Sequence, residues 1–475
     1  MIRLSANIIY DVEMDLVKRI QNASYQNFNR ITKEEIYTTI KNINLLGDAP
    51  GRFITIFVAF LTIVGCLLYL YWLSFIYGLV VTILVGSLIA NYIFRIRLFN
   101  RKYAEMRALQ SEYYKSLNDL IFGFKDIKIS QKKNARIFED FILKNKGISK
   151  NIETNLKQRF SSNSTIANYM CYLLLALALF TLPKIREINI ANSVSFIVIL
   201  VYIISPITQL VSFFSFFSGL KDVSKSLNLI ESKLLDIENI NKTFNRGQKL
   251  EDFSEIRFKD VGFEYYDKNN KTSFSLGPIN LKLRKGEVVF IVGDNGSGKS
   301  TFLNLLTGLE MPSKGNIYYN GVLIDENNYE DYRNKISAVF FEGYLLSEDY
   351  EDLNLTSKNK KFSDYLALVK MDRIAQERDI FKSKEKLSKG QQKRLALVLA
   401  LLTEKKILVL DEWAAEQDPL FREYFYESII PDLKRQGITI IAITHDHSFF
   451  RTSDRIIKFK NGSNYEMVGS ESIQY

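Results

Sequence analysis

The chain has few of the residues that build disulfide frameworks or metal sites. Its 475 residues include two cysteines and two histidines. Cys66 and Cys171 both lie inside uncharged apolar runs, which argues against a disulfide framework and against a cysteine-bound metal. His445 and His447 are the only histidines in the sequence, so a histidine-based metal site is not expected either.

Charge is missing from three long stretches of the first half of the chain, residues 53–94, 160–183 and 188–220. A helix needs about 20 apolar residues to cross a membrane, so the first stretch is long enough for two helices with a turn near residues 72–74. We expect Pro206 to kink the last helix. Buried helices of a soluble protein are rarely so long and so free of charge. We therefore predict four membrane spans, at about 53–73, 75–94, 160–183 and 191–213.

Basic residues concentrate between the second and third predicted spans. Residues 95–159 carry 16 Lys and Arg side chains against 7 Asp and Glu, in a chain whose formal net charge is +10. Such a cluster can indicate nucleic-acid binding, but loops beside membrane helices are also basic on the cytoplasmic side. We therefore expect no nucleic-acid partner and predict an integral protein of the cytoplasmic (inner) membrane. Lys184 and Arg186, on the outer side, are a small exception.

The sequence pattern changes near residue 256, where short β-rich runs begin to alternate with helical ones. Before this point, Val223, Leu227, Ile230 and Leu234 have the spacing of one amphipathic helix. The change predicts a helical transmembrane domain over residues 1–235 with cytoplasmic helices at 1–52 and 95–159, a linker over 236–250, and an α/β domain over 251–475.

A complete phosphate-binding loop lies in the C-terminal domain. Residues 288–292 have the composition of a buried strand, and a glycine-rich loop and a helix follow directly, as the motif requires. Backbone N–H groups of such a loop surround phosphates, Lys299 supplies a positive charge to the β- and γ-phosphate oxygens, and Ser300 offers a hydroxyl to Mg²⁺. We predict a P-loop NTPase domain whose ATP-binding residues are Gly293, Asp294, Asn295, Gly296, Ser297, Gly298, Lys299, Ser300 and Thr301.

A second apolar strand, residues 407–410, ends in the two acids Asp411 and Glu412. Asp411 is predicted to bind Mg²⁺ through water, and Glu412 is predicted to act as the base that orients the attacking water. Apolar strands with acidic ends are common, but this one follows the phosphate loop at about 110 residues, which supports the interpretation.

A polar turn, Leu387-Ser388-Lys389-Gly390-Gln391, opens a helix in this domain. Together with the motifs above it resembles the signature motif of ABC-transporter ATPases, with Lys389 where the commonest form has glycine. The resemblance implies that Ser388, Gly390 and Gln391 bind the γ-phosphate of ATP held by a partner subunit. An ordinary helix N-cap at Ser388 is the alternative.

Three further segments resemble ABC motifs, in the order that the family has them. The strand that leads to His445 resembles the switch-histidine strand, which implies a contact between His445 and the γ-phosphate. The turn before Asp418 resembles the D-loop, which implies that Asp418 lies at a dimer interface. The strand around Tyr265 resembles the segment whose aromatic ring stacks on adenine. An ordinary strand tyrosine, with Tyr266 adjacent, is the alternative.

Besides Lys389, two further positions depart from the common ABC pattern. Phe341, followed by Glu342, stands where ABC domains usually carry a glutamine that contacts Mg²⁺ and water, so Glu342 is the candidate replacement. Trp413 replaces the usual proline after Glu412. With residues 277–281, these departures resemble the cyclic-peptide exporter family, which is associated with export of microcin-like peptides, lipopeptides and siderophore precursors.

The resemblance implies an ATP-hydrolysing half-transporter that pairs with a second copy of itself or with a related half-transporter. ATP and Mg²⁺ would bind between the phosphate loop of one chain and Ser388 and Gly390 of the other, and hydrolysis at Glu412 would reset the membrane helices. The helices over 95–159 would reach the ATPase and transmit its motion. Membrane lipid and the transported small molecule or peptide are the other expected partners.

Four predicted spans are fewer than the six of the family's half-transporters. A membrane-tethered regulatory ATPase, a lipid flippase and an N-terminally truncated, non-transporting remnant therefore stay open as alternatives. Residues 1–52 have the length and polarity of a cytoplasmic loop that follows an earlier span. A misplaced start, or a separate two-span membrane protein as a further partner, would account for this pattern. The uncharged runs argue against a soluble ABC factor that acts on ribosomes or DNA.

Overall fold

The structure is a computed structural model, and it describes residues 2–155, 158, 169, 190–234, 250–266, 272–346, 348–356, 358–377 and 386–467. The chain forms two compact units. The first consists of Met1–Asn22 and Ile31–Leu234, and the second consists of Ala23–Arg30 and Leu235–Tyr475. The short helix α2 (Tyr25–Phe28) therefore belongs to the second unit, although the flanking helices belong to the first.

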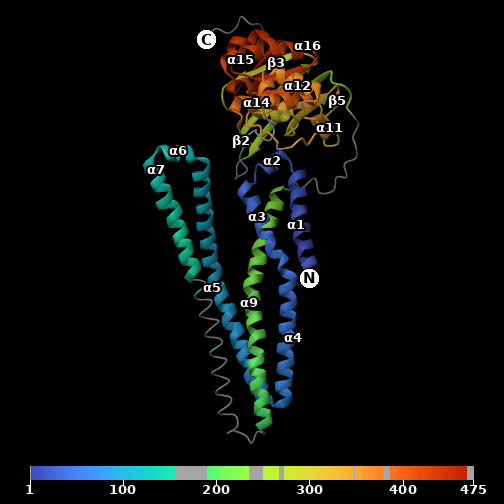
Figure 1. Cartoon of the computed structure of the whole chain (residues 1–475). Coiled ribbons are helices and arrows are strands. Elements are labelled where there is room, and N and C mark those ends of the chain that lie inside the picture. Colours follow the sequence, from blue (N-terminus) through green and yellow to red (C-terminus); the bar gives the residue numbers. More distant parts are fainter. Residues whose placement is uncertain are drawn as a thin grey trace. The chain divides into compact units, whose positions relative to one another are not determined.

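Long helices build the first unit, and Figure 1 shows α4 and α9 running side by side. Thr32 caps one of them with a capping box, in which its hydroxyl accepts from the Glu35 N–H and the Glu35 carboxylate accepts in return. The helices are α1 (Ile2–Asn22), α3 (Lys33–Gly47), α4 (Ala49–Leu73), α5 (Phe75–Phe122), α6 (Phe124–Ile129), α7 (Gln131–Arg136), the π-helix η1 (Ile137–Leu143) and α9 (Ile190–Leu234).

Apolar side chains cover both the inside and the outside of the helices in the uncharged stretch. Ile63 and Leu70 of α4 are buried with Phe196 and Ile203 of α9. On the other faces of α4 and α5, large apolar side chains are exposed, such as Trp72 at 80%. A helix that is apolar all round suits a lipid environment better than water. Among the described residues, Lys33–Leu73 is the one helical stretch long and apolar enough to cross a membrane.

The predicted spans fall on the structure in different ways. The first lies in α4 and the second in α5, and these helices meet at Ser74, the position of the expected turn. The fourth span lies in α9, which contains Pro206 within one continuous helix. The third span, 160–183 except for Tyr169, and the predicted linker, 236–250 except for Leu250, lie outside the described residues.

One expectation is corrected at the end of the first unit. The amphipathic positions from Val223 to Leu234 do not form a separate helix, because they are the last turns of α9. Val223, Ile230 and Leu234 are buried, as the spacing predicted. No proline follows Pro206 in this helix, so nothing in the local sequence ends it before Leu234.

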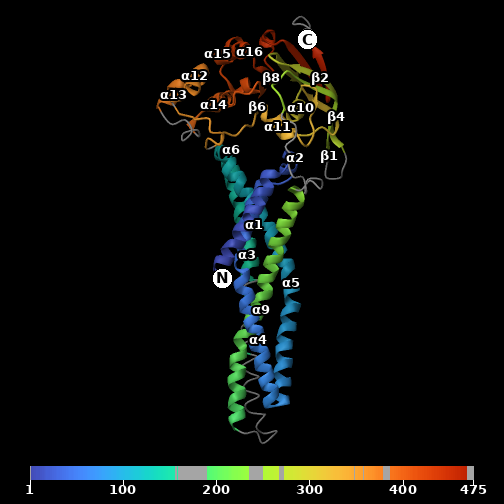
Figure 2. The ribbon, with the colours of Figure 1, turned by 90° about the vertical axis from the view of Figure 1, so that its right-hand side faces the viewer.

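The second unit contains two sheets, shown in Figure 2 with β1, β2 and β4 on the side opposite α12–α14. An antiparallel sheet has the order β2-β1-β4-β5, and a six-stranded sheet has the order β10-β9-β3-β8-β7-β6. The strands are β1 (Glu255–Tyr266), β2 (Thr272–Arg284), β3 (Val288–Gly293), β4 (Lys314–Tyr319), β5 (Val322–Leu323), β6 (Ile336–Val339), β7 (Ile407–Asp411), β8 (Thr439–Ile443), β9 (Arg455–Lys460) and β10 (Ser463–Met467).

Helices and helical turns connect these strands and cover the six-stranded sheet. They are α10 (Lys299–Leu306), α11 (Tyr329–Asn334), α12 (Lys360–Leu368), α13 (Asp372–Glu377), α14 (Lys389–Leu402), the 3₁₀ turn η3 (Trp413–Glu416), α15 (Pro419–Tyr424), the π-helix η4 (Phe425–Ile429), α16 (Ile430–Arg435) and the 3₁₀ turn η5 (His447–Thr452).

Both faces of β3 are buried, which explains why its sequence is an unbroken apolar run. Phe290 packs into a core on one face with α14, while Ile291 packs into a core on the other face with α10. A strand of a parallel sheet is buried on both sides, so it needs apolar side chains at every position. Since β3, β7 and β8 run parallel, their carboxyl ends meet at one edge of the sheet. That edge carries the predicted ATP site.

Candidate functional site

The phosphate loop joins β3 to α10. Gly293, Gly296 and Gly298 have φ angles of 144°, 76° and 105°, which side-chain-bearing residues rarely adopt. A Cβ at Gly293 would lie 2.3 Å from the Phe459 carbonyl oxygen, so the loop also needs glycine there for space. Ser297 has a buried hydroxyl without a hydrogen-bond partner in the part of the chain that the structure describes.

Lys299, the first residue of α10, bends back over this loop. Its side chain is buried, and its ammonium donates to the carbonyl oxygens of Gly293 (2.7 Å) and Asp294 (3.0 Å). Burial lowers the pKa of the Lys299 ammonium, and the nearby carboxylates of Glu412, Asp294 and Asp411 oppose that effect. A bound phosphate would add negative charge beside this ammonium and would therefore stabilise the charged form of Lys299 further.

The two acids lie at the end of β7 beside the switch histidine. Asp411 accepts a hydrogen bond from the backbone N–H of Phe341 at 3.3 Å, and burial raises the pKa of its carboxyl. Glu412 has left-handed backbone angles (φ 46°, ψ 35°), and its N–H donates to the Ile443 carbonyl of β8. Its carboxylate lies 3.3 Å from Nε2 of His445, so the structure brings the predicted base and the histidine together.

Tyr265 lies beside the phosphate-loop helix. Its hydroxyl forms hydrogen bonds with Thr301 and Asn304 of α10, and burial raises the pKa of the phenol. The ring packs edge-on against Phe263, at 4.9 Å between ring centroids. Tyr25 of α2 is close enough to influence the phenol electrostatically. The predicted adenine-stacking residue is thus next to the phosphate site, and it also has the packing of an ordinary strand tyrosine.

The signature turn and the D-loop form a second group. Ser388 is the N-cap of α14 in a capping box, in which its hydroxyl accepts from the Gln391 N–H and the Gln391 side chain accepts in return. Gln417 donates to the Gly390 carbonyl at 3.1 Å. Asp418 caps α15 and accepts from Arg394 at 2.8 Å. The structure therefore shows the N-cap interpretation of Ser388, and the implied nucleotide role stays a prediction.

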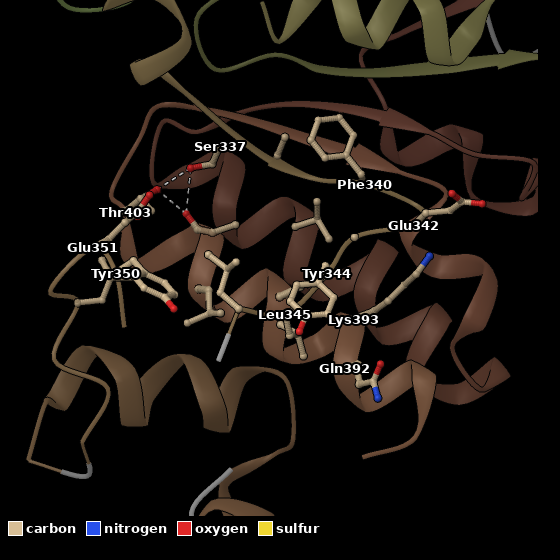
Figure 3. Close-up of a pocket in the computed structure, with 18 of the residues that line it drawn as sticks. Ser337, Phe340, Glu342, Tyr344, Leu345, Tyr350, Glu351, Gln392, Lys393 and Thr403 are labelled. Carbon is tan, nitrogen blue, oxygen red and sulfur yellow. Dashed lines mark hydrogen bonds between the residues drawn. The ribbon is translucent and has the colours of Figure 1, made fainter. Parts of the chain in front are cut away.

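A cavity of about 650 Å³ lies between β6, the loop that follows it and α14, and Figure 3 shows the side chains that line it. Phe341 and Glu342, which stand in place of the usual glutamine, both line this cavity. Phe341 reaches Asp411 through its backbone N–H rather than through its side chain. Glu342 is exposed at the end of the loop.

Sequence reasoning missed an arginine that links two motifs. Arg422 of α15 donates to the Ala415 and Gln417 carbonyls of the D-loop, at 3.3 and 3.2 Å, and to the Asp446 carboxylate at 3.1 Å. Asp446 directly follows His445. The only sequence signal for this link is the place of Arg422 one helical turn after Asp418, which does not reveal that the switch-histidine loop lies beside α15.

Comparison with known proteins identifies the family. The family model described as ABC transporter matches residues 276–415. An uncharacterized ABC transporter ATP-binding protein from Methanocaldococcus jannaschii is 32% identical over 223 residues, which cover 45% of this chain and 99% of that protein. This chain belongs to the ABC transporter family.

Two further comparisons concern the layout of this ABC protein. The ATP-binding protein SyrD of Pseudomonas syringae pv. syringae is 42% identical over 211 residues, so the match spans 44% of this chain and 37% of SyrD. The solved structure of a bacterial Atm1-family ABC exporter with ATP bound has a TM-score of 0.81 and 16% identity, over 98% of this chain and 83% of that one. The predicted fold, a helical N-terminal region joined to a C-terminal ABC P-loop domain, is confirmed.

The residues of the ABC site fit ATP and Mg²⁺. The glycine-rich loop at the N-terminus of α10 directs backbone N–H groups and the buried Ser297 hydroxyl towards a region suited to an anion. Ser300 is exposed at the start of the same helix, and Asp411 supplies carboxylate oxygens, so both can serve a hard cation. Lys299 and the Glu412–His445 pair complete a site that can bind and hydrolyse a nucleoside triphosphate.

Proposed function

We propose that this chain is an ATP-hydrolysing half-transporter that exports a peptide-derived compound across the cytoplasmic membrane as a dimer. The close approach of Glu412 to His445 beside the phosphate loop carries the ATPase part of this proposal. The fold shared with an Atm1-family exporter and the similarity to SyrD support the transport part. The ABC domain lies in the cytoplasm in this proposal, with the helices of the first unit in the membrane.

The reaction follows from the positions of five side chains. Lys299 holds the β- and γ-phosphates by its positive charge, which replaces its present contacts with the loop carbonyls. Ser300, and Asp411 through water, would hold Mg²⁺, which would neutralise part of the phosphate charge when bound. Glu412 orients and deprotonates the attacking water. His445 fixes the Glu412 carboxylate and contacts the γ-phosphate with the same ring.

Glu412→Gln tests the base. The amide keeps the size of the side chain but accepts a proton poorly, so we expect the ATPase rate of the purified full-length protein to fall by about 100-fold or more while ATP binding is retained. Trapping of an ATP-bound dimer, seen as a shift in size-exclusion chromatography, should accompany the loss. Equal ATPase rates in the wild type and Glu412→Gln would contradict the assignment.

A substrate panel tests the transport part. The wild-type protein in liposomes is given cyclic peptides, lipopeptides, siderophore precursors or lipids, and the change in its ATPase rate is measured. We expect a peptide-derived compound to stimulate hydrolysis, because transport substrates couple to the cycle that consumes ATP. Glu412→Gln in the same liposomes is the control. Stimulation by lipids alone would indicate a flippase instead.

A further inference from the structure

Lys393 of α14 is buried in a way that does not favour the stability of the fold. Its side chain is 8% exposed, and its ammonium has no hydrogen-bond partner among the residues that the structure describes. Burial lowers the pKa of this ammonium, while the carboxylates of Glu416, Asp411 and Glu412 favour its charged form. A buried cation without hydrogen bonds is costly, so a lysine at this position needs a reason other than packing.

The Lys393 side chain lies against the ring of Phe341, in the loop that follows β6. Its Nζ lies 4.3 Å from the centroid of the Phe341 ring, within the range of a cation–π interaction. The backbone N–H of the same Phe341 donates to Asp411. In Figure 3 the side chain extends from α14 towards the end of the loop where Glu342 lies. The ammonium of Lys393 therefore contacts the side chain of the same residue whose backbone N–H binds Asp411.

The backbone of Lys393 is fixed as well. Its carbonyl oxygen accepts a hydrogen bond of 2.7 Å from Nε1 of Trp413, a buried residue that directly follows Glu412. Phe341 and Trp413 are two of the positions at which the sequence departs from the common ABC pattern. Both contact the same lysine, so the two departures form one structural unit.

We propose that Lys393 is a positioning residue that takes over, in this chain, the part of the missing loop glutamine. A phenylalanine side chain cannot donate a hydrogen bond, but its ring face attracts a cation. The ammonium holds the Phe341 loop so that its backbone N–H stays on Asp411, and it presents a fixed positive charge to Asp411 and Glu412. Preorganised charge of this kind acts most strongly in a site shielded from water. The inference rests on the proposed ATPase function.

Lys393→Met separates this role from a structural one. Methionine has similar length but no charge, so the burial cost of the ammonium disappears and the thermal midpoint of the nucleotide-free full-length protein should stay equal or rise. The ATPase kcat should nevertheless fall about tenfold, with the KM for ATP nearly unchanged, because positioned charge is lost. Lys393→Arg keeps the charge and should retain more activity than Lys393→Met. A purely structural lysine predicts the opposite pattern, in which the midpoint falls and activity follows it.

A matched control and a double-mutant cycle complete the experiment. Lys405→Met removes another lysine of the same cavity, whose ammonium donates to the Ile336 carbonyl at 3.2 Å, and should leave kcat unchanged. Phe341→Leu should lower kcat, and adding Lys393→Met to it should cause little further loss, because the two side chains act together.

The outcomes distinguish this inference from the proposed function. If the wild type hydrolyses ATP and Lys393→Met has the same kcat, the role of Lys393 is overturned and the ATPase assignment stays intact. Additive losses in the double mutant would have the same meaning. Absence of hydrolysis in the wild type would instead overturn the proposed function.

Discussion

At the scale of single residues, the site depends on residues whose burial or backbone angles few other residue types would tolerate. Lys299 is 6% exposed and is bound by two carbonyl oxygens of its own loop. Glu412 has left-handed backbone angles that a glutamate rarely adopts, a form of local strain that is often found at functional sites. The geometry of the catalytic pair is thus set by its backbone and by its neighbours together.

Lys299→Ala tests the phosphate loop. Removal of the ammonium takes away the cation that the structure places over this loop, so we expect the Kd for a fluorescent ATP analogue to rise by about 100-fold or more, with loss of turnover. Lys434→Ala is the control, because this exposed lysine pairs with Asp454 away from the site. Unchanged nucleotide binding in Lys299→Ala would contradict the role given to it.

At the scale of secondary-structure elements, the N-terminus of α14 has two explanations that one substitution can separate. Aspartate caps a helix about as well as serine, while alanine does not, so Ser388→Asp should keep the thermal midpoint and Ser388→Ala should cost about 1 kcal/mol of stability. If Ser388 also meets the γ-phosphate, the negative charge of Ser388→Asp should abolish ATPase activity. Full ATPase activity in Ser388→Asp would leave the cap as its role.

Elements whose signals are local in the sequence could be predicted, and those that depend on distant packing could not. The phosphate loop and the acidic end of β7 each follow an apolar strand, so their positions at one sheet edge could be inferred from the parallel arrangement. The contact of Arg422 with Asp446 has no local signal, and the burial of Lys393 has only a single one. Lys393 does precede Leu397 by one helical turn, which places it on the buried face of α14.

The length of α9 was also underestimated from the sequence. The last uncharged run ends at residue 220 and the predicted fourth span at 213, but a helix continues wherever nothing breaks it and one face stays buried. Val223 and Ile230 provide that buried face. The residue pattern identified the contacts of this segment correctly and missed its continuity with the membrane portion.

At the scale of the whole molecule, the proposed ATP site belongs to two chains. Chains with Lys299→Ala and chains with Ser388→Arg should each be inactive alone. Random mixing should restore about a quarter of the wild-type ATPase activity, because half of the dimers then contain one intact site out of two. The fraction of heterodimers is measured with two affinity tags. Full activity from a strictly monomeric protein in detergent would contradict a shared site.

The continuity of α9 has a mechanical consequence. Its 45 residues rise about 1.5 Å each, which makes a rod of about 65 Å from Ile190 to Leu234. A rod of that length is a lever, since a tilt of about 5° at one end displaces the other by about 6 Å. Its last turns are packed at Ile230 and at Leu234, the last residue of the first unit. Small rotations at this end would therefore become large displacements among the apolar residues at the other.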